Sequence, residues 1–75
     1  MQGLRDIPAM KEIHPLVLDI QSRIFAHRLR VLSVMSRAGV DASTWWRWTQ
    51  GAEPKLGTLD RVNRAIDEAI EETRQ

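Results

Sequence analysis

The side chains best suited to chemistry in this chain lie in one short segment near its middle. Four of them recur at intervals of three and four residues, which places them on one face of a helix: Ser43, Trp46, Arg47 and Gln50. The Arg47 guanidinium can present two donors to O6 and N7 of guanine, and the Gln50 amide can pair with N6 and N7 of adenine. Trp46 can pack on a thymine methyl group or a sugar edge, and Ser43 and Thr44 can bond phosphate. This face therefore suits the edges and backbone of a nucleic acid.

Each of these side chains also has a simpler interpretation. Arg47 and Gln50 can be solvated or can touch phosphate alone, and Ser43 and Thr44 can complete a helix cap. Trp46 can instead serve a protein contact, such as a dimer interface.

Two further tryptophans, Trp45 and Trp48, lie three residues apart and share the opposite face of the same helix. We expect both in the core, because two indoles are a large fraction of what so small a domain can bury. Their expected role is to aim the helix.

Helix signals bound this segment at both ends. Gly39 can take a positive φ in a tight turn, and Val40 can pack beneath that turn. Asp41 suits the N-cap, because its carboxylate can accept from backbone N–H groups two and three residues on. Gly51 suits the left-handed position after the helix, and Pro54 prevents the helix from resuming. We expect a short helix over about residues 42 to 50.

The segment before the turn predicts two helices. From Pro15, well placed as a first helical residue, the chain runs to Ala38 without another glycine or proline. Its apolar residues form two stripes, Leu16, Ile20 and Ile24 in one and Phe25, Leu29, Leu32 and Met35 in the other. A single long helix would expose one stripe, so we expect a bend around residues 26 to 30 between helices of about 16 to 26 and 30 to 38. No strong helix breaker marks this bend.

The two ends of the chain differ in character. Residues 1 to 14 show no apolar period and predict an N-terminal arm, with one helical turn near residues 9 to 13; residues 15 to 75 form the domain. An amphipathic helix is expected over about residues 57 to 73, with this apolar stripe: Leu59, Val62, Ile66, Ala69 and Ile70. Acidic residues crowd its C-terminal end, where the helix dipole disfavours them. That mismatch indicates either a frayed end or a partner surface.

Charge is unevenly distributed, although the net charge is only +1. Residues 20 to 57 carry six cationic side chains against two carboxylates, a local net charge of +4, whereas residues 58 to 75 carry three against five, a local net charge of −2. A solvated surface is the ordinary explanation of such a run. Because the basic part coincides with the segment described above, we expect it to dock on a polyanion.

Several functional classes are disfavoured. His14 and His27 lie thirteen residues apart with no cysteine or acidic residue at ligand spacing, so we expect no metal site. No serine stands in a plausible triad and no glycine-rich phosphate loop is present, so we expect no enzyme, no cofactor and no small-molecule substrate. The chain lacks cysteine, a signal peptide pattern and an apolar run of the roughly 20 residues that span a bilayer. A cytoplasmic protein without membrane contact is expected.

The residues from Val34 to Gly51, V-M-S-R-A-G-V-D-A-S-T-W-W-R-W-T-Q-G, match a known pattern. They are similar to the helix-turn-helix of the phage-repressor-like superfamily (lambda repressor, Cro and XRE-type proteins), whose common form is L-A-x-x-x-G-V-S-x-x-T-I-x-x-W-x-x-G. The following P-K-L-G-T-L-D-R-V, Pro54 to Val62, resembles the family's next helix. The resemblance covers about residues 27 to 73, and short proteins with similar S-T-W-x-R-W segments look like phage and prophage products.

Two residues depart from the family pattern. Met35 stands where the family usually has alanine, because two helices approach closely there; a flexible thioether can be accommodated with an altered helix crossing. Trp46 stands at an outward position usually held by a small or polar residue.

The resemblance implies an all-α fold of four or five short helices, with the helix of residues 42 to 50 in the major groove of duplex DNA. It implies base contacts from the outward face described above and, beside the phosphate contact from Thr44 of the same helix, phosphate contacts from residues that flank the neighbouring helices: Arg28, Arg30, Arg37 and Lys55. The expected function is sequence-specific DNA binding by a transcription regulator. A module this small buries little surface, so useful affinity calls for a homodimer or a second DNA-bound partner. The alternatives are an accessory DNA-binding protein in phage recombination or packaging, and a helical adaptor that binds protein.

Overall fold

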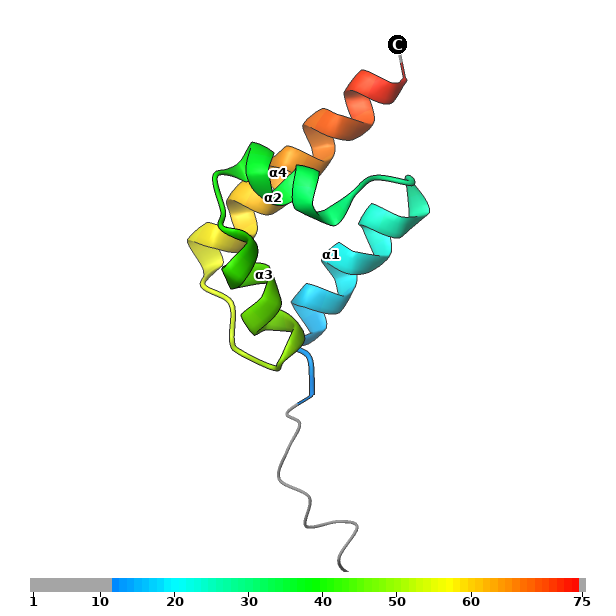
Figure 1. The fold of residues 1–75 in the computed structure, drawn as a ribbon. Coiled ribbons are helices and arrows are strands. Elements are labelled where there is room, and N and C mark those ends of the chain that lie inside the picture. Colours follow the sequence, from blue (N-terminus) through cyan, green and yellow to red (C-terminus); the bar gives the residue numbers. More distant parts are fainter. Residues whose placement is uncertain (1–11, 75) are drawn as a thin grey trace, which may run out of the picture.

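The computed structural model describes residues 12 to 74 and is all-helical over that range, without a strand. Its helices are α1 (Pro15–Ala26), α2 (Val31–Ala38), α3 (Ala42–Thr49) and α4 (Leu56–Thr73) (Figure 1). The all-α prediction is confirmed, and each observed boundary lies within one residue of the expected one. The expected arm of residues 1 to 14 lies outside the described residues except for residues 12 to 14, which are not helical.

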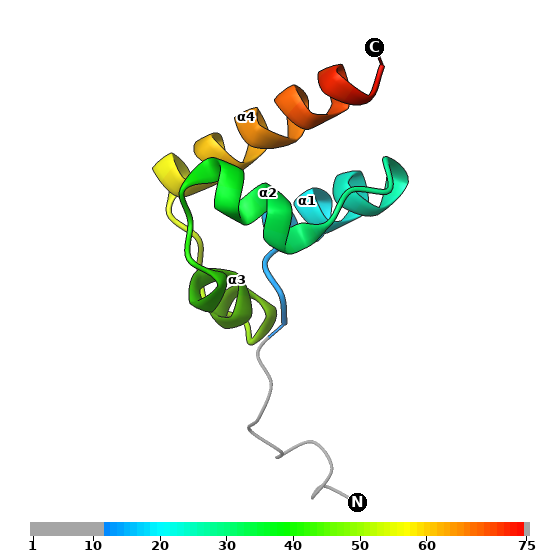
Figure 2. The same ribbon diagram turned by 45° about the horizontal axis from the view of Figure 1, so that its top comes forward.

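Three helices, α1, α2 and α4, pack together, and α3 lies at the end of α2. α1 and α2 both pack against α4, and the last turns of α4 project beyond the other helices (Figures 1 and 2). α3 follows the C-terminal end of α2 and contacts it at the turn. None of the helices within residues 12 to 74 combines the length and apolar character needed to cross a membrane.

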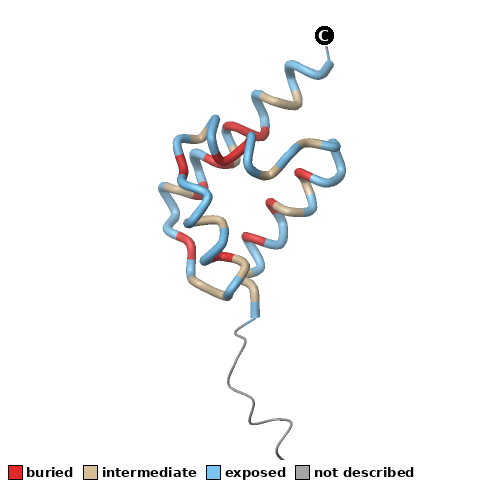
Figure 3. The backbone as a smooth tube through the Cα atoms, in the orientation of Figure 1, coloured by how far each residue is buried: buried red, intermediate tan, exposed pale blue. Residues whose placement is uncertain are grey.

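One apolar cluster holds the domain together. Figure 3 shows buried positions recurring along the side of α1 that faces the centre of the molecule. The cluster draws on every helix and on the turn before α3: Val17, Ile20, Ile24, Val34, Met35, Val40, Trp48, Leu59, Val62, Ala65 and Ile66. It contains no buried polar or charged residue among those described. Met35 is almost completely buried, so its thioether is accommodated in the core.

The expected apolar stripes of the first two helices were only partly right. In α1 the core positions are Val17, Ile20 and Ile24, and Leu16 is 45% exposed. Of the second stripe Met35 is buried and Leu29 packs partly against the core, but two members are exposed: Phe25 and Leu32. The reason is that the bend rotates α2 relative to α1, so one continuous helical register cannot describe both.

At the bend, α1 ends with a residue whose type does not favour the conformation that the helix end requires. The Arg28 N–H donates to the Phe25 carbonyl at 3.0 Å, and the Leu29 N–H donates to the Ile24 carbonyl at 2.9 Å. These two bonds form a Schellman motif, in which the residue that follows the C-cap adopts a left-handed conformation. That residue is Arg28, at φ 57°. Ile24 belongs to the core cluster and Leu29 packs against it, so the burial of these two residues holds Arg28 in this conformation.

Replacing Arg28 by glycine is expected to stabilise the domain. A non-glycine residue in the left-handed region costs about 1–2 kcal/mol, which the substitution removes. Glycine also has more conformational freedom in the unfolded chain, and this lowers the stability of the variant by about 0.5–1 kcal/mol. The net gain of about 0.5–1 kcal/mol should raise the Tm by about 5 °C for a domain of this size. Thermal unfolding followed by circular dichroism measures this shift. Arg28→Ala is the control: it removes the same charge but retains Cβ, and a gain as large as that of Arg28→Gly would contradict the strain argument.

The same motif ends α2 and α3, with glycine at the left-handed position in both. Gly39 has φ 73°, and the Val40 N–H donates to the Met35 carbonyl at 2.8 Å. Gly51 has φ 98°, and the Ala52 N–H donates to the Arg47 carbonyl at 3.0 Å. The predicted positive φ of Gly39 and the predicted burial of Val40 are both confirmed. The connection between α2 and α3 is therefore fixed by backbone bonds and by one buried apolar residue.

Gly39→Val should destabilise the domain by about 1–2 kcal/mol or more, because a β-branched residue is disfavoured at positive φ. The cost is in the backbone: a Cβ built on Gly39 meets only Arg61 Nη1, at 4.0 Å, which is ordinary contact. Gly57→Ala is the matched control, since its Cβ would meet nothing within 4 Å and α4 would gain about 0.5–1 kcal/mol in helix propensity. Denaturant unfolding compares the two. Equal effects of the two substitutions would show that Gly39 is not required by its conformation.

The acidic side of α4 is neutralised by arginines. Arg23 of α1 pairs with Asp67 at 2.6 Å, and Arg37 of α2 pairs with Glu72 at 2.7 Å and Glu68 at 3.6 Å. The remaining pairs lie within α4 and its C-terminal residue, Arg64 with Asp60 and Arg74 with Glu71. The acidic end of α4 that seemed unfavourable in the sequence thus faces cations from the two helices packed beside it.

Candidate nucleic-acid interface

The outward face of α3 presents the four side chains that the sequence singled out. All four are exposed and occupy consecutive turns: Ser43, Trp46, Arg47 and Gln50. Trp46 is 65% exposed. The Trp46 backbone carbonyl accepts from Thr49 Oγ1 at 2.6 Å, a bond within the helix that leaves the indole uninvolved. The face therefore offers an arginine, an amide, a hydroxyl and an indole to solvent.

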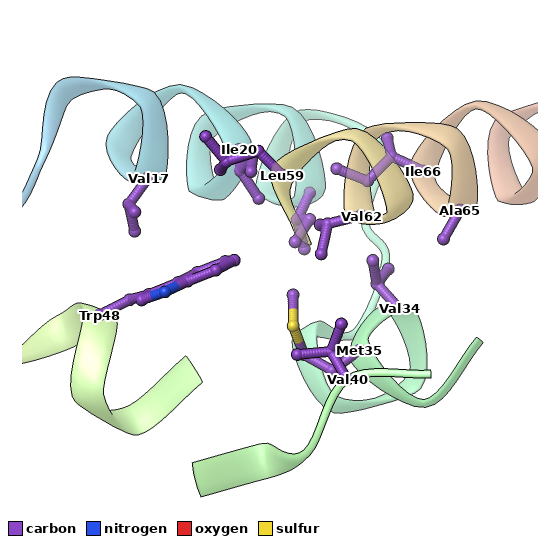
Figure 4. Packing of buried hydrophobic residues seen from close by; sticks show 11 residues of the cluster. Val17, Ile20, Val34, Met35, Val40, Trp48, Leu59, Val62, Ala65 and Ile66 are labelled. Atoms are coloured by element: carbon purple, nitrogen blue, oxygen red, sulfur yellow. The ribbon is translucent and has the colours of Figure 1, made fainter. Parts of the chain in front are cut away.

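The opposite face of α3 is anchored by one indole. Trp48 is 3% exposed, and Figure 4 shows it extending from α3 toward Val17 and Ile20 of α1. Trp45 is only partly buried and packs on the edge of the cluster, so the expectation that both tryptophans are core residues was half right. Their rings meet edge to face, with centroids 6.1 Å apart and planes at 66°. This pair sets the direction in which the outward face points.

The N-terminal end of α3 differs from the expectation. Asp41 occupies the N-cap position with an extended backbone at φ −65° and ψ 148°, but its side chain makes no capping hydrogen bond. The first turn is closed instead by the backbone, where the Thr44 N–H donates to the Asp41 carbonyl at 3.0 Å. The local position of Asp41 was predictable, whereas the rotamer that exposes its carboxylate was not.

A hollow between α3 and the start of α4 brings together three of the predicted contact residues, Thr44, Arg47 and Lys55. Glu53 shares the same hollow and offsets part of its positive charge. Lys55 is exposed and takes part in no ion pair among the described residues, so its ammonium group is available in the hollow beside Arg47. This arrangement suits an anion such as a phosphate on the flank of α3.

The free cations are distributed differently from the paired ones. Within residues 12 to 74, five basic side chains take part in no ion pair: Arg28, Arg30, Arg47, Lys55 and Arg61. Every carboxylate of α4, by contrast, is paired. The local charge contrast of the sequence is thus largely cancelled around α4, and the uncompensated positive charge lies on α3, on the start of α4 and at the α1–α2 bend.

Three arginines predicted as phosphate contacts lie apart from the hollow beside α3. Arg37 donates through both terminal nitrogens to Glu72, at 2.9 and 2.7 Å, which raises the pKa of the guanidinium through hydrogen bonding and charge attraction. Its side chain is thus directed to α4. Arg28 and Arg30 stand before the first turn of α2, at the end of that helix opposite to α3, and both are exposed.

Sequence reasoning missed Arg61. Arg61 Nη1 lies 4.0 Å from the position of a Cβ on Gly39, over the connection between α2 and α3. The residue stands in the second turn of α4 and carries no ion pair among the described residues. No local pattern identifies it, because its neighbourhood depends on how α4 packs against the end of α2.

The histidines have ordinary structural positions. His14 Nδ1 accepts from the Leu16 N–H at 3.1 Å and so caps α1, and His27 is exposed at the end of the same helix. No group of three or more histidine, aspartate and glutamate side chains within residues 12 to 74 could hold a metal ion. The chain matches no protein-family model, no curated protein and no solved structure.

Proposed function

We propose that this chain binds duplex DNA through α3, as a helix-turn-helix of the phage-repressor-like kind, and that it regulates transcription by recognising a specific sequence. The observation that carries the proposal is the division of α3 into two faces. Trp48 fixes the helix to the core, while Ser43, Arg47 and Gln50 stand exposed with hydrogen-bonding groups that match base edges.

The dimensions of α2 and α3 support this function. Each has eight residues, and an α-helix is about 10–12 Å across with its side chains, close to the width of about 12 Å of the major groove. Three residues separate the two helices, as in helix-turn-helix units that place their second helix in the groove. In this arrangement Arg47 and Gln50 read bases, while Thr44, Lys55 and Arg61 hold phosphates beside the helix.

The small number of base pairs that α3 can contact calls for a second DNA-binding unit. One eight-residue helix reads only a few base pairs, so useful affinity calls for a second copy or a second DNA-bound protein on an adjacent half-site. The free charges at Arg28 and Arg30 are available to extend the contact along the backbone.

The test is a titration of the full chain with a random duplex and with duplexes enriched by selection, at two salt concentrations. We expect the selected duplex to bind at least about tenfold more tightly, because one bidentate base contact contributes about 1–3 kcal/mol. Affinity for both should fall with salt as counterions are released. Equal affinity for both duplexes would favour the accessory role over the regulator. Failure to bind any duplex at moderate salt would overturn the proposal and favour a protein-binding adaptor.

A further inference from the structure

Trp46 is the residue of α3 that the proposed function leaves without a role. Its indole is 65% exposed, whereas those of Trp45 and Trp48 pack against the core and each other. An exposed indole keeps a large apolar surface in water, which is unfavourable unless a ligand covers it. Trp46 also lies in the middle of the outward face, between Ser43 and Gln50, so any ligand of that face must meet it.

The chemistry of the major groove offers few matches to such a side chain. Guanine, adenine and cytosine present hydrogen-bond donors and acceptors there, and the C5-methyl group of thymine is the apolar group of the groove. The sugar edges are a second apolar surface, but they lie beside charged, solvated phosphates and outside the floor of the groove, which the centre of α3 faces in the proposed arrangement. Since the indole must displace water in the groove, it gains most where that water covers a methyl group.

We propose that Trp46 recognises the C5-methyl group of thymine, so that the preferred DNA carries a thymine in a base pair close to the guanine contacted by Arg47. This inference rests on the proposed function and specifies its target. Trp46 and Arg47 are consecutive residues, separated by about 1.5 Å along the helix axis, while base pairs are about 3.4 Å apart. Because consecutive side chains also point about 100° apart around the helix, the two reach different base pairs that lie close together.

The charges around Trp46 favour DNA over a protein surface. Arg47 follows it directly, and Lys55 and Glu53 line the hollow beside Arg47. Arg47 and Lys55 take part in no ion pair among the described residues, whereas the acidic residues of α4 are all paired with arginines. An apolar ring next to a free guanidinium fits a ligand that combines phosphates with methyl groups.

The experiment removes one methyl group at a time. Each thymine of the selected duplex is replaced by uracil, which lacks only the C5-methyl group, and the dissociation constant of the full chain is measured by fluorescence anisotropy of labelled DNA. At one position, or two neighbouring ones, we expect binding to weaken about fourfold, as for the loss of one buried methyl group. Trp46→Ala should bind the thymine and uracil duplexes equally, and Trp46→Phe should keep most of the discrimination.

Gln50→Ala is the control for changes in DNA shape. It alters the same helix face but leaves the indole, so its affinity should still fall about fourfold when that thymine is replaced. An alternating adenine–thymine duplex and its uracil counterpart provide the same comparison if binding proves independent of sequence.

The outcomes separate the two proposals. Absence of binding to every duplex would overturn both, and would direct attention to a protein partner for Trp46. Binding with equal affinity for thymine and uracil duplexes would overturn the role of Trp46 alone. Discrimination that persists in Trp46→Ala would assign methyl recognition to another residue.

Discussion

Replacing Trp48 by alanine should remove a large part of the free energy of unfolding. Removal of a buried indole costs about 3–5 kcal/mol, and a domain of this length has a total unfolding free energy of about 4–11 kcal/mol. Trp48 is 3% exposed, and it is the one residue of α3 in the buried cluster. Chemical denaturation followed by circular dichroism measures the loss, with the helical signal in water showing whether a folded state survives.

The two neighbouring tryptophans supply matched controls for Trp48→Ala. Trp45→Ala should destabilise less, because the Trp45 ring is only partly buried, and Trp46→Ala should hardly change stability, because its ring is exposed. The three substitutions remove the same atoms from one eight-residue helix. Equal losses for all three would mean that burial does not determine the contribution of these rings.

Arg47→Ala should weaken binding to the selected duplex by about 1–3 kcal/mol and binding to random DNA much less, if the guanidinium contacts a guanine. The side chain is exposed and makes no ion pair among the described residues, so the free energy of unfolding should stay unchanged. Anisotropy titrations on both duplexes measure the two losses. Equal losses on the two would make Arg47 a backbone contact, and no loss on either would place α3 outside the DNA interface.

Lys55→Ala provides the contrasting case. Lys55 lies in the hollow beside Thr44 and Arg47, where the proposed function places a phosphate. Its loss should weaken binding to all sequences alike and should lower the slope of log affinity against log salt by about one unit. A sequence-dependent loss would instead mean that Lys55 reaches a base.

Local signals predicted most of the fold. Gly39 and Gly51 carry their own conformational signature, and each marks a helix end where the structure has one. The α1–α2 bend was inferred only from the impossibility of burying two stripes, because Arg28 in the left-handed region has no signature in the sequence. Arg28 is held there by the packing of Ile24 and Leu29 in and against the core, which depends on the tertiary structure.

The candidate site was predictable in direction but not in detail. Helical periodicity alone places Ser43, Trp46, Arg47 and Gln50 on one exposed face, and the structure agrees. Periodicity cannot rank Trp45 against Trp48, because the two lie on the same face and their burial depends on where α1 passes. Nor can it foresee that Arg37 is directed to Glu72 or that Arg61 reaches the turn, since both positions depend on the packing of α4.

The single anchor of α3 has a consequence for motion. α1 contributes three buried residues to the core and α4 four, whereas α3 contributes only Trp48. An isolated helix of eight residues is not stable in water, so α3 should open locally before the rest of the domain unfolds, and its amide hydrogens should exchange with solvent first. A ligand on the outward face would then have to close this helix as it binds. Trp48 lies on the opposite side of α3, yet it would influence how tightly the outward face binds its ligand, without contacting that ligand.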